Sequence, residues 1–229
     1  MACWSSENAT KAYLRALKMG KRGKEPDSAE FISALAAGNG ARLMVMVPSS
    51  SPRRGAGEDA SMALALVAAA HQTGGRVVLV SPGPEESRAS REALGAHARR
   101  VEFLVGKART LLSNELRGAD FVLLDCGGGD DPRGAFEAAR EGGGGGIVVG
   151  YNALHAGASW SGLRAHFLPI GEGLMVTRIA KGAEAGGKII GGSGGGCRKK
   201  SRWVVTVDDC TGEEHVFRIV LPQRKQIEA

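Results

Sequence analysis

The sequence has few cysteines and no long apolar run, and each shortage excludes a class of protein. The four cysteines form no C-x-x-C pair, which excludes the usual zinc and thiol-redox motifs. Because the thiols are scattered and no secretory signal is recognisable, we expect a reducing compartment, the cytoplasm, with the nucleus as the alternative. No apolar run approaches the ~20 residues that span a bilayer, so no membrane partner is expected.

Aromatic residues are also scarce, at 5% of the 229 residues, so the core must consist mainly of Val, Leu, Ile and Ala. The formal net charge of +6 permits weak attraction to nucleic acid or anionic metabolites but specifies neither. No basic strand carries the aromatic residues typical of nucleic-acid recognition. We interpret the basic clusters at residues 18–24 and 198–202 as solvated loops, and we do not expect a nucleic-acid partner.

The chain does contain a regular alternation of helices and apolar strands. Strands are predicted at residues 42–47, 76–80, 100–105, 120–124 and 147–150, with helices at 28–37, 58–72, 84–96, 107–116 and 131–140. Short apolar strands that alternate with helices are typical of a parallel sheet covered on both faces. Residues 163–179 depart from this pattern and predict an antiparallel pair joined at Pro169–Gly173.

We divide the chain into four parts on these patterns. Residues 1–25 form an N-terminal helix and linker, and residues 26–180 form the α/β domain. Residues 181–201 are rich in Gly and Lys and predict a flexible loop. Residues 202–229 predict a C-terminal hairpin extension that turns at Asp209–Gly212.

Candidate site residues follow the strands, because ligands of open α/β sheets lie beyond the carboxyl ends of the strands. Asp125, in the stretch "ADFVLLDCGGGDD", is the best single candidate. Cys126 follows it and is either a neighbour of the ligand or an inert buried thiol. After the first strand come Pro48, Ser49 and Ser50, where the serine hydroxyls would bond a polar ligand or the whole segment would form a solvated loop.

The other strand ends add weaker candidates. Ser81 ends the second strand, and Glu85 either contacts a ribose or simply lies at a helix N-terminus. Gly106, after the third strand, permits close approach of a ligand to the backbone. Asp131 is interpreted mainly as the cap of the next helix. The fifth strand ends near Asn152 and His155, which are polar and close to the crevice.

Several segments resemble a known family. The stretches "LPIGEGLMVTRI", "VEFLVGKARTLL", "ADFVLLDCGGGDD" and "GGIVVGYNALHAG" are similar to segments of the cation-dependent O-methyltransferases of the caffeoyl-CoA and catechol type. The resemblance implies a Rossmann-like S-adenosylmethionine (SAM) methyltransferase sandwich, mostly parallel, with an antiparallel final strand pair. It also implies SAM as cofactor, Gly106 and Ala108 beside its adenine, and a homodimer or a protein partner.

The whole chain is similar to a narrower family. With "MACWSSENATKAYL", "AEFISALAAGN" and "GEEHVFR", it resembles the plant family of methyltransferase-like proteins called domain of unknown function 1442.

Compared with the O-methyltransferases, the site is altered. Asp125 and Asn152 match two metal-binding positions, but the aspartate between them falls on Tyr151, and a phenol is a poor ligand for Mg²⁺. A conserved lysine of that family falls on Gly128. An acid of the cofactor loop is replaced by Met44, and the ribose-binding acid falls on Ser81 or Pro82. We therefore expect no metal.

The sequence thus favours a divergent SAM-dependent methyltransferase-like protein that acts without a metal if it acts as an enzyme. Its methyl acceptor is unknown, with a small molecule as the candidate. Methyl transfer can depend largely on proximity and orientation, which suits a site with little acid–base machinery. The alternative is a non-catalytic protein of the same fold that acts as a binding or regulatory partner. No catalytic residue is assigned. The predicted cofactor-binding residues are Pro48, Ser49, Ser50, Ser81, Glu85, Gly106, Ala108, Asp125 and Cys126.

Overall fold

A computed structural model of the chain describes residues 4–20, 28–48, 56–128, 131–142, 145–155, 165–179, 201–207 and 214–220. Internal contacts divide the chain into two compact units, Met1–Gly186 and Gly187–Ala229. The first unit holds a sheet with helices on both faces, and the described part of the second is a pair of strands.

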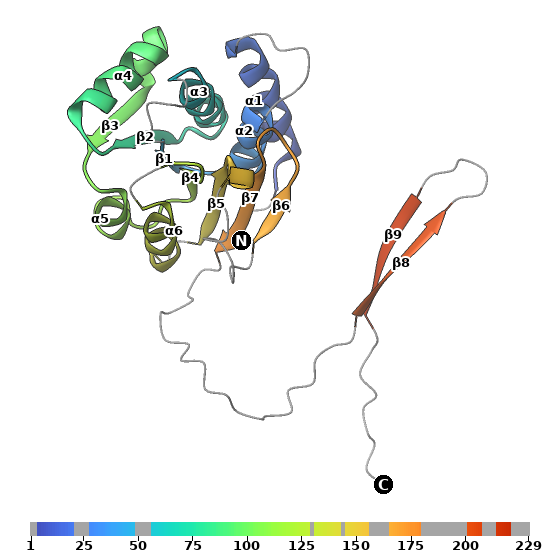
Figure 1. Ribbon diagram of the computed structural model, residues 1–229. Helices are drawn as coiled ribbons and strands as arrows, with labels where there is room; N and C mark the ends of the chain where they lie inside the picture. The colour runs from blue at the N-terminus through green and yellow to red at the C-terminus, as the bar shows by residue number, and fades with distance from the viewer. Residues whose placement is uncertain are drawn as a thin grey trace, which may run out of the picture. The chain divides into compact units, whose positions relative to one another are not determined.

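The first unit is built on a seven-stranded sheet with the order β3-β2-β1-β4-β5-β7-β6 (Figure 1). The strands β1 to β5 pair in parallel, whereas β7 is antiparallel to both β5 and β6. This topology confirms the predicted fold class, a mostly parallel, Rossmann-like α/β sandwich with an antiparallel final pair. The strands are β1 (Leu43–Val47), β2 (Arg76–Ser81), β3 (Val101–Val105), β4 (Phe121–Asp125), β5 (Gly146–Tyr151), β6 (His166–Leu168) and β7 (Leu174–Ile179).

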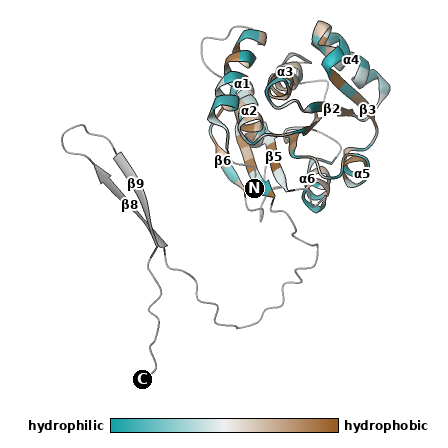
Figure 2. Ribbon diagram, turned by 180° about the vertical axis from the view of Figure 1, so that it is seen from behind, coloured by the Kyte–Doolittle hydropathy of each residue, from teal (hydrophilic) through white to brown (hydrophobic). Residues whose placement is uncertain are grey.

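Helices cover both faces of this sheet. On one face lie α1 (Ser6–Met19), α2 (Ser28–Gly38), α3 (Ala56–Thr73) and α4 (Pro84–Leu94), which runs into the 3-10 helix η1 (Gly95–Arg100). On the other face lie α5 (Ala108–Ser113) and α6 (Pro132–Glu141), and a short 3-10 turn, η2 (Ala153–His155), follows β5. Figure 2 shows hydrophobic residues along the central strands and mainly hydrophilic residues on α1 and α4.

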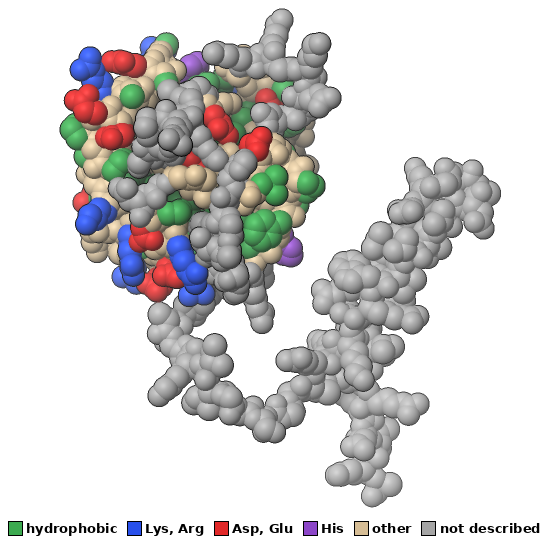
Figure 3. Space-filling model, in the orientation of Figure 1, with side chains coloured by type: hydrophobic (Ala, Val, Ile, Leu, Met, Phe, Trp, Pro, Cys, Tyr) green, Lys and Arg blue, Asp and Glu red, His purple; other side chains and the backbone are tan. Residues whose placement is uncertain are grey.

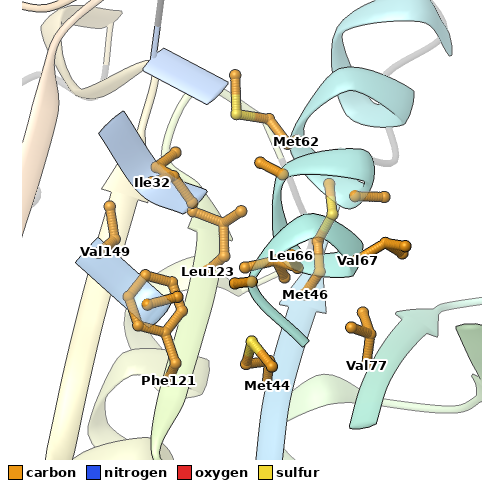
Figure 4. Packing of buried hydrophobic residues seen from close by; sticks show 14 of the residues in the cluster. Ile32, Met44, Met46, Met62, Leu66, Val67, Val77, Phe121, Leu123 and Val149 are labelled. Atoms are coloured by element: carbon orange, nitrogen blue, oxygen red, sulfur yellow. The ribbon is translucent and has the colours of Figure 1, made fainter. Parts of the chain in front are cut away.

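The strands separate two hydrophobic clusters. Side chains that alternate along β1 point to opposite faces, so Met44 and Met46 pack with α2 and α3, whereas Val45 packs with α5 and α6. Figure 4 shows the first cluster, in which Leu123 of β4 lies beside Ile32 of α2, and Phe121 packs nearer the start of β4. Central strands buried on both faces explain why β1, β2 and β4 are nearly continuous apolar runs.

Two helices end elsewhere than the sequence pattern predicts. The prediction ended α2 at Ala37, but Gly38 is still helical, and a Cβ atom there would collide with the ring of Trp4. Gly40 instead takes the left-handed conformation, with φ +67°, that ends the segment. The helix predicted over 107–116 stops at Ser113, because the Leu116 N–H turns back to the Leu111 carbonyl.

The described part of the second unit is the antiparallel pair β8 (Ser201–Val207) and β9 (Glu214–Val220). This pair confirms the predicted C-terminal hairpin strands. The turn predicted at Asp209–Gly212 and the Gly/Lys-rich stretch up to residue 200 lie outside the described residues. Among the helices that the structure describes, none has the length and apolar character needed to cross a membrane.

Candidate functional site

A cavity of about 440 Å³ opens at the carboxyl ends of the central strands. Its walls come from the ends of β1, β2 and β4, the turn after β3, and the first residues of α5 and α6. The strand order reverses between β1 and β4, and this switch point is where open α/β sheets bind their ligands.

Several predicted site residues come together in this cavity. Pro48, Gly106, Ala108 and Asp125 all line it, although they are far apart in the sequence. Lys107, which follows Gly106, lines it too. The topology brings these residues together because parallel strands end at the same edge of the sheet.

Other predicted site residues lie elsewhere. Ser81 is fully buried and does not line the cavity, because alternation along β2 turns it away from Val80, which does. Glu85 is exposed in the first turn of α4, outside the cavity. Cys126 packs in the hydrophobic cluster between the sheet and α5 and α6. Ser49 and Ser50 lie outside the described residues.

Asp125 is the buried acid of the site and is only 3% exposed. Its Oδ1 accepts hydrogen bonds from the Gly127 N–H at 2.8 Å and from the Asn152 side-chain amide at 3.1 Å. Asn152 reaches this position with φ +58°, a left-handed conformation that asparagine tolerates better than most residues. The tight turns after β4 and β5 therefore hold the carboxylate in one orientation.

Tyr151, beside this pair, is bonded to the start of α3. Its hydroxyl donates to Asp59 Oδ1 at 2.6 Å, and its side chain is 1% exposed. Burial, followed by the negative charges of Asp59 and Asp125, raises the pKa of Tyr151 well above its ordinary value. The phenol is therefore a neutral donor at physiological pH, and it ties the end of β5 to α3.

The residues at the matched metal positions do not fit a divalent cation. Asn152 directs its amide N–H₂ at Asp125, whereas a shared cation would need oxygens from both side chains. Tyr151 donates its proton to Asp59. Within the part of the chain that the structure describes, no group of three or more His, Cys, Asp or Glu side chains has a metal-binding arrangement.

The mouth of the cavity is polar. Arg109 at the start of α5 lies 4.0 Å from Asp131 at the start of α6, and both line the cavity. Asp131 Oδ1 also accepts from the Gly134 N–H at 2.7 Å, which confirms its predicted role as the cap of α6. Both side chains are more than half exposed, so this pair contributes little to stability.

Sequence reasoning missed Asp59 and Arg109 as residues of this region. No role was assigned to either residue from the sequence. The available signal was the tyrosine that ends β5, since a buried phenol usually needs a hydrogen-bond partner.

Comparison with known proteins gives the family of the chain. The profile of the family described as "Protein of unknown function (DUF1442)" matches residues 1–219. The chain belongs to the DUF1442 family. No curated protein matches this DUF1442 chain at a significant level.

Solved structures similar to the DUF1442 chain include several methyltransferases. A methyltransferase from Geobacter sulfurreducens is 18% identical, with 76% of this chain and 90% of that chain covered and a TM-score of 0.49. A protein of Staphylococcus aureus, provisionally described as a caffeoyl-CoA O-methyltransferase, is 13% identical over 77% and 93% of the two chains, with a TM-score of 0.49. The SAH-bound methyltransferase PaMTH1 of Podospora anserina is 14% identical over 79% and 91%, with a TM-score of 0.48.

Proposed function

We propose that this protein is a divergent SAM-dependent methyltransferase, and that the cavity at the carboxyl ends of β1, β2 and β4 binds the cofactor. The observation that carries the proposal is this cavity of about 440 Å³, at the switch point of a methyltransferase-type sheet. Small-molecule sites commonly span ~300–1,000 Å³, so the space suits one cofactor-sized ligand.

The residues of the cavity fit the chemistry of SAM. Pro48, Val80 and Leu124 offer apolar walls for a flat base, and Gly106 leaves the backbone open to it. Asp125 supplies a fixed carboxylate that suits the cationic amino or sulfonium group of the cofactor. SAM, when bound, supplies an electrophilic methyl group.

The proposed reaction needs no metal. The cation-dependent O-methyltransferases would use oxygen ligands at the positions of Asp125, Tyr151 and Asn152. In this chain the hydrogen bonds of Tyr151 to Asp59 and of Asn152 to Asp125 occupy these groups. Proximity and orientation of the acceptor would therefore carry the transfer.

A small molecule is the proposed methyl acceptor. Acidic and basic side chains are interspersed on the face of the molecule shown in Figure 3, and a nucleic acid would favour an extended basic surface.

A non-catalytic role is the second candidate, and one observation favours it. Cys126 follows Asp125, but burial, followed by the charge of Asp125, raises the pKa of its thiol to about 12, so the thiol is a poor nucleophile or base. Among the described residues that line the cavity, there is no histidine and no cysteine. A protein that binds SAM or its demethylated product, and whose bound state a partner recognises, would need neither a histidine nor a cysteine there.

Calorimetric titration with S-adenosylhomocysteine tests the proposal. We expect saturable binding to the full chain, and loss of binding in Ala108→Phe, which fills the cavity from the first residue of α5. Ala93→Phe, at an exposed position of α4 outside the cavity, is the matched control and should bind normally. Absence of heat and of a thermal shift in the unmodified chain would reject cofactor binding.

Transfer of a labelled methyl group then separates the two candidates. Label transferred from SAM to small molecules of a metabolite extract, unaffected by a chelator, supports the enzyme. Binding of S-adenosylhomocysteine with no transfer supports the non-catalytic protein. Transfer that a chelator abolishes contradicts the metal-independent site.

A further inference from the structure

A second cavity, of about 580 Å³, lies between α1, the C-terminal part of α3 and η1. Figure 1 shows α1 and α3 on the same side of the sheet. Because α3 runs back from the carboxyl end of β1 and η1 directly precedes β3, this cavity lies towards the amino ends of the strands. As far as the described residues go, the two cavities have no lining residue in common.

The lining of this second cavity combines apolar walls with basic groups. Leu14, Met19 and Val67 form the apolar part. Among the described residues that line it, none is acidic. Around the apolar part lie four cationic side chains and two imidazoles: Lys11, Arg15, Lys18, His71, His97 and Arg100.

Three of the four cations find no acidic partner in the part of the chain that the structure describes. Lys11 pairs with Glu7 on the exposed side of α1. Within the described residues, Arg15, Lys18 and Arg100 form no ion pair. The Nε of Arg15 is buried and has no hydrogen-bond partner there. A buried guanidinium nitrogen without an acceptor is costly, so an acceptor supplied by a ligand would stabilise this site.

Helix ends explain only part of this charge. Lys18 and His71 lie in the last turns of α1 and α3, where a positive side chain interacts favourably with the helix dipole. Arg15 lies one turn earlier in α1, and Arg100 ends η1, so the dipoles give no account of the unpaired nitrogen of Arg15.

We propose that this second cavity binds a small phosphorylated molecule that has an apolar body. Guanidinium groups match the oxygens of a phosphate, and several cations around one space favour a group of more than one negative charge. Leu14 is 50% exposed beside them and offers a surface for the apolar body. The volume suits a small molecule rather than a folded partner.

Phenyl phosphate is the probe that combines the two features, with inorganic phosphate and phenol as its separate halves. We expect calorimetry on the full chain to show tighter binding of phenyl phosphate than of either half. The affinity should fall as salt is added, because a charged group is being screened. S-adenosylhomocysteine should not displace the probe, which separates this result from the proposed function.

Variants locate the site. Arg100→Gln, at an exposed position, and Arg15→Gln should each lower the affinity for phenyl phosphate by about 10-fold. This is the loss expected for one charge-assisted hydrogen bond. Arg133→Gln on α6 removes the same charge from the other face of the sheet and should bind as the unmodified chain does. The ring signals of His71 and His97, two of the five histidines, should shift in NMR spectra when the probe binds.

Three results would overturn the proposal. The first is no binding of phenyl phosphate, the second is equal binding by Arg100→Gln, Arg15→Gln and Arg133→Gln, and the third is displacement of the probe by S-adenosylhomocysteine. Binding of an acidic peptide that depends on Arg100, without binding of phenyl phosphate, would assign the surface to a protein partner instead.

Discussion

At the scale of single residues, burial determines the chemistry of Cys126. The pKa of its thiol is raised to about 12 from an ordinary value of 9.0, first by desolvation and then by the charge of Asp125. The folded state therefore holds this proton more tightly than the unfolded state does. The contribution of the protonated thiol to the free energy of unfolding is complete below pH ~9, and it is lost as the pH rises towards 12.

We predict that this thiol makes the protein less stable at alkaline pH. Between pH 9 and 10 the free energy of unfolding should fall, with a slope approaching about 1.4 kcal/mol per pH unit from this one group. Urea unfolding of the unmodified chain and of Cys126→Ala measures the difference. Cys126→Ala loses packing, so its free energy of unfolding should be lower at every pH. That free energy should fall less steeply with pH than in the unmodified chain. Equal pH slopes in the two proteins would contradict the raised pKa of Cys126.

Of the side-chain contacts around Asp125, one could be predicted from the sequence and one could not. Asp125 and Asn152 were expected near each other because both follow strands that end at one edge of the sheet, and they form a hydrogen bond. The bond between Tyr151 and Asp59 was not predicted, because it joins residues 92 positions apart and depends on where α3 begins. A pattern along the chain carries no information about which helix end meets which strand.

At the scale of elements, Asp120 fixes how three neighbouring strands align. Its Oδ2 accepts from the N–H groups of Arg42 and Leu43, both at 2.9 Å, just before and at the start of β1. Its backbone also bonds to Leu43 and to Ile147 at the start of β5. One residue before β4 therefore aligns the beginnings of three neighbouring strands.

We predict that Asp120→Ala lowers the free energy of unfolding by about 2 kcal/mol, because two backbone donors lose a charged acceptor. Asp120→Asn keeps one acceptor oxygen without the charge and should lose about half as much. Chemical unfolding of the three proteins measures the series. A change in Asp120→Ala below ~0.5 kcal/mol would show that water replaces the carboxylate at no cost.

Element positions were largely predictable, and their ends were less so. Buried strands such as β4 are read directly from apolar runs, because both faces exclude charge. Helix ends depend on contacts that the sequence does not reveal, such as the Trp4 ring against Gly38. The helix predicted over 107–116 failed for the same reason, because a turn back to Leu111 ends α5 early.

At the scale of the whole molecule, the two hydrophobic clusters share the central strands of the first unit. The alternation of strands and helices was sufficient to predict this layered fold. The reaction was not predictable in the same way, because it depends on a few side chains in loops after the strands. The same sheet accommodates either an enzyme or a binding protein.

We predict that hydrogen exchange in the first unit follows the distance of each strand from the sheet centre. The amides of β1 and β4 should exchange most slowly, with a free energy of opening close to that of global unfolding, because both strands pair on each side and lie between the two clusters. Among the described strands, the edge strand β6 pairs with β7 alone. Its Phe167 side chain is 59% exposed, so β6 should exchange early through local opening. Exchange measured by mass spectrometry in the unmodified chain and in Asp120→Ala tests both statements. In Asp120→Ala, the free energy of opening in β1 and β4 should fall by the same amount as the free energy of global unfolding. Exchange in β6 should change little. Equal protection of β6 and β4 would contradict an open edge at β6.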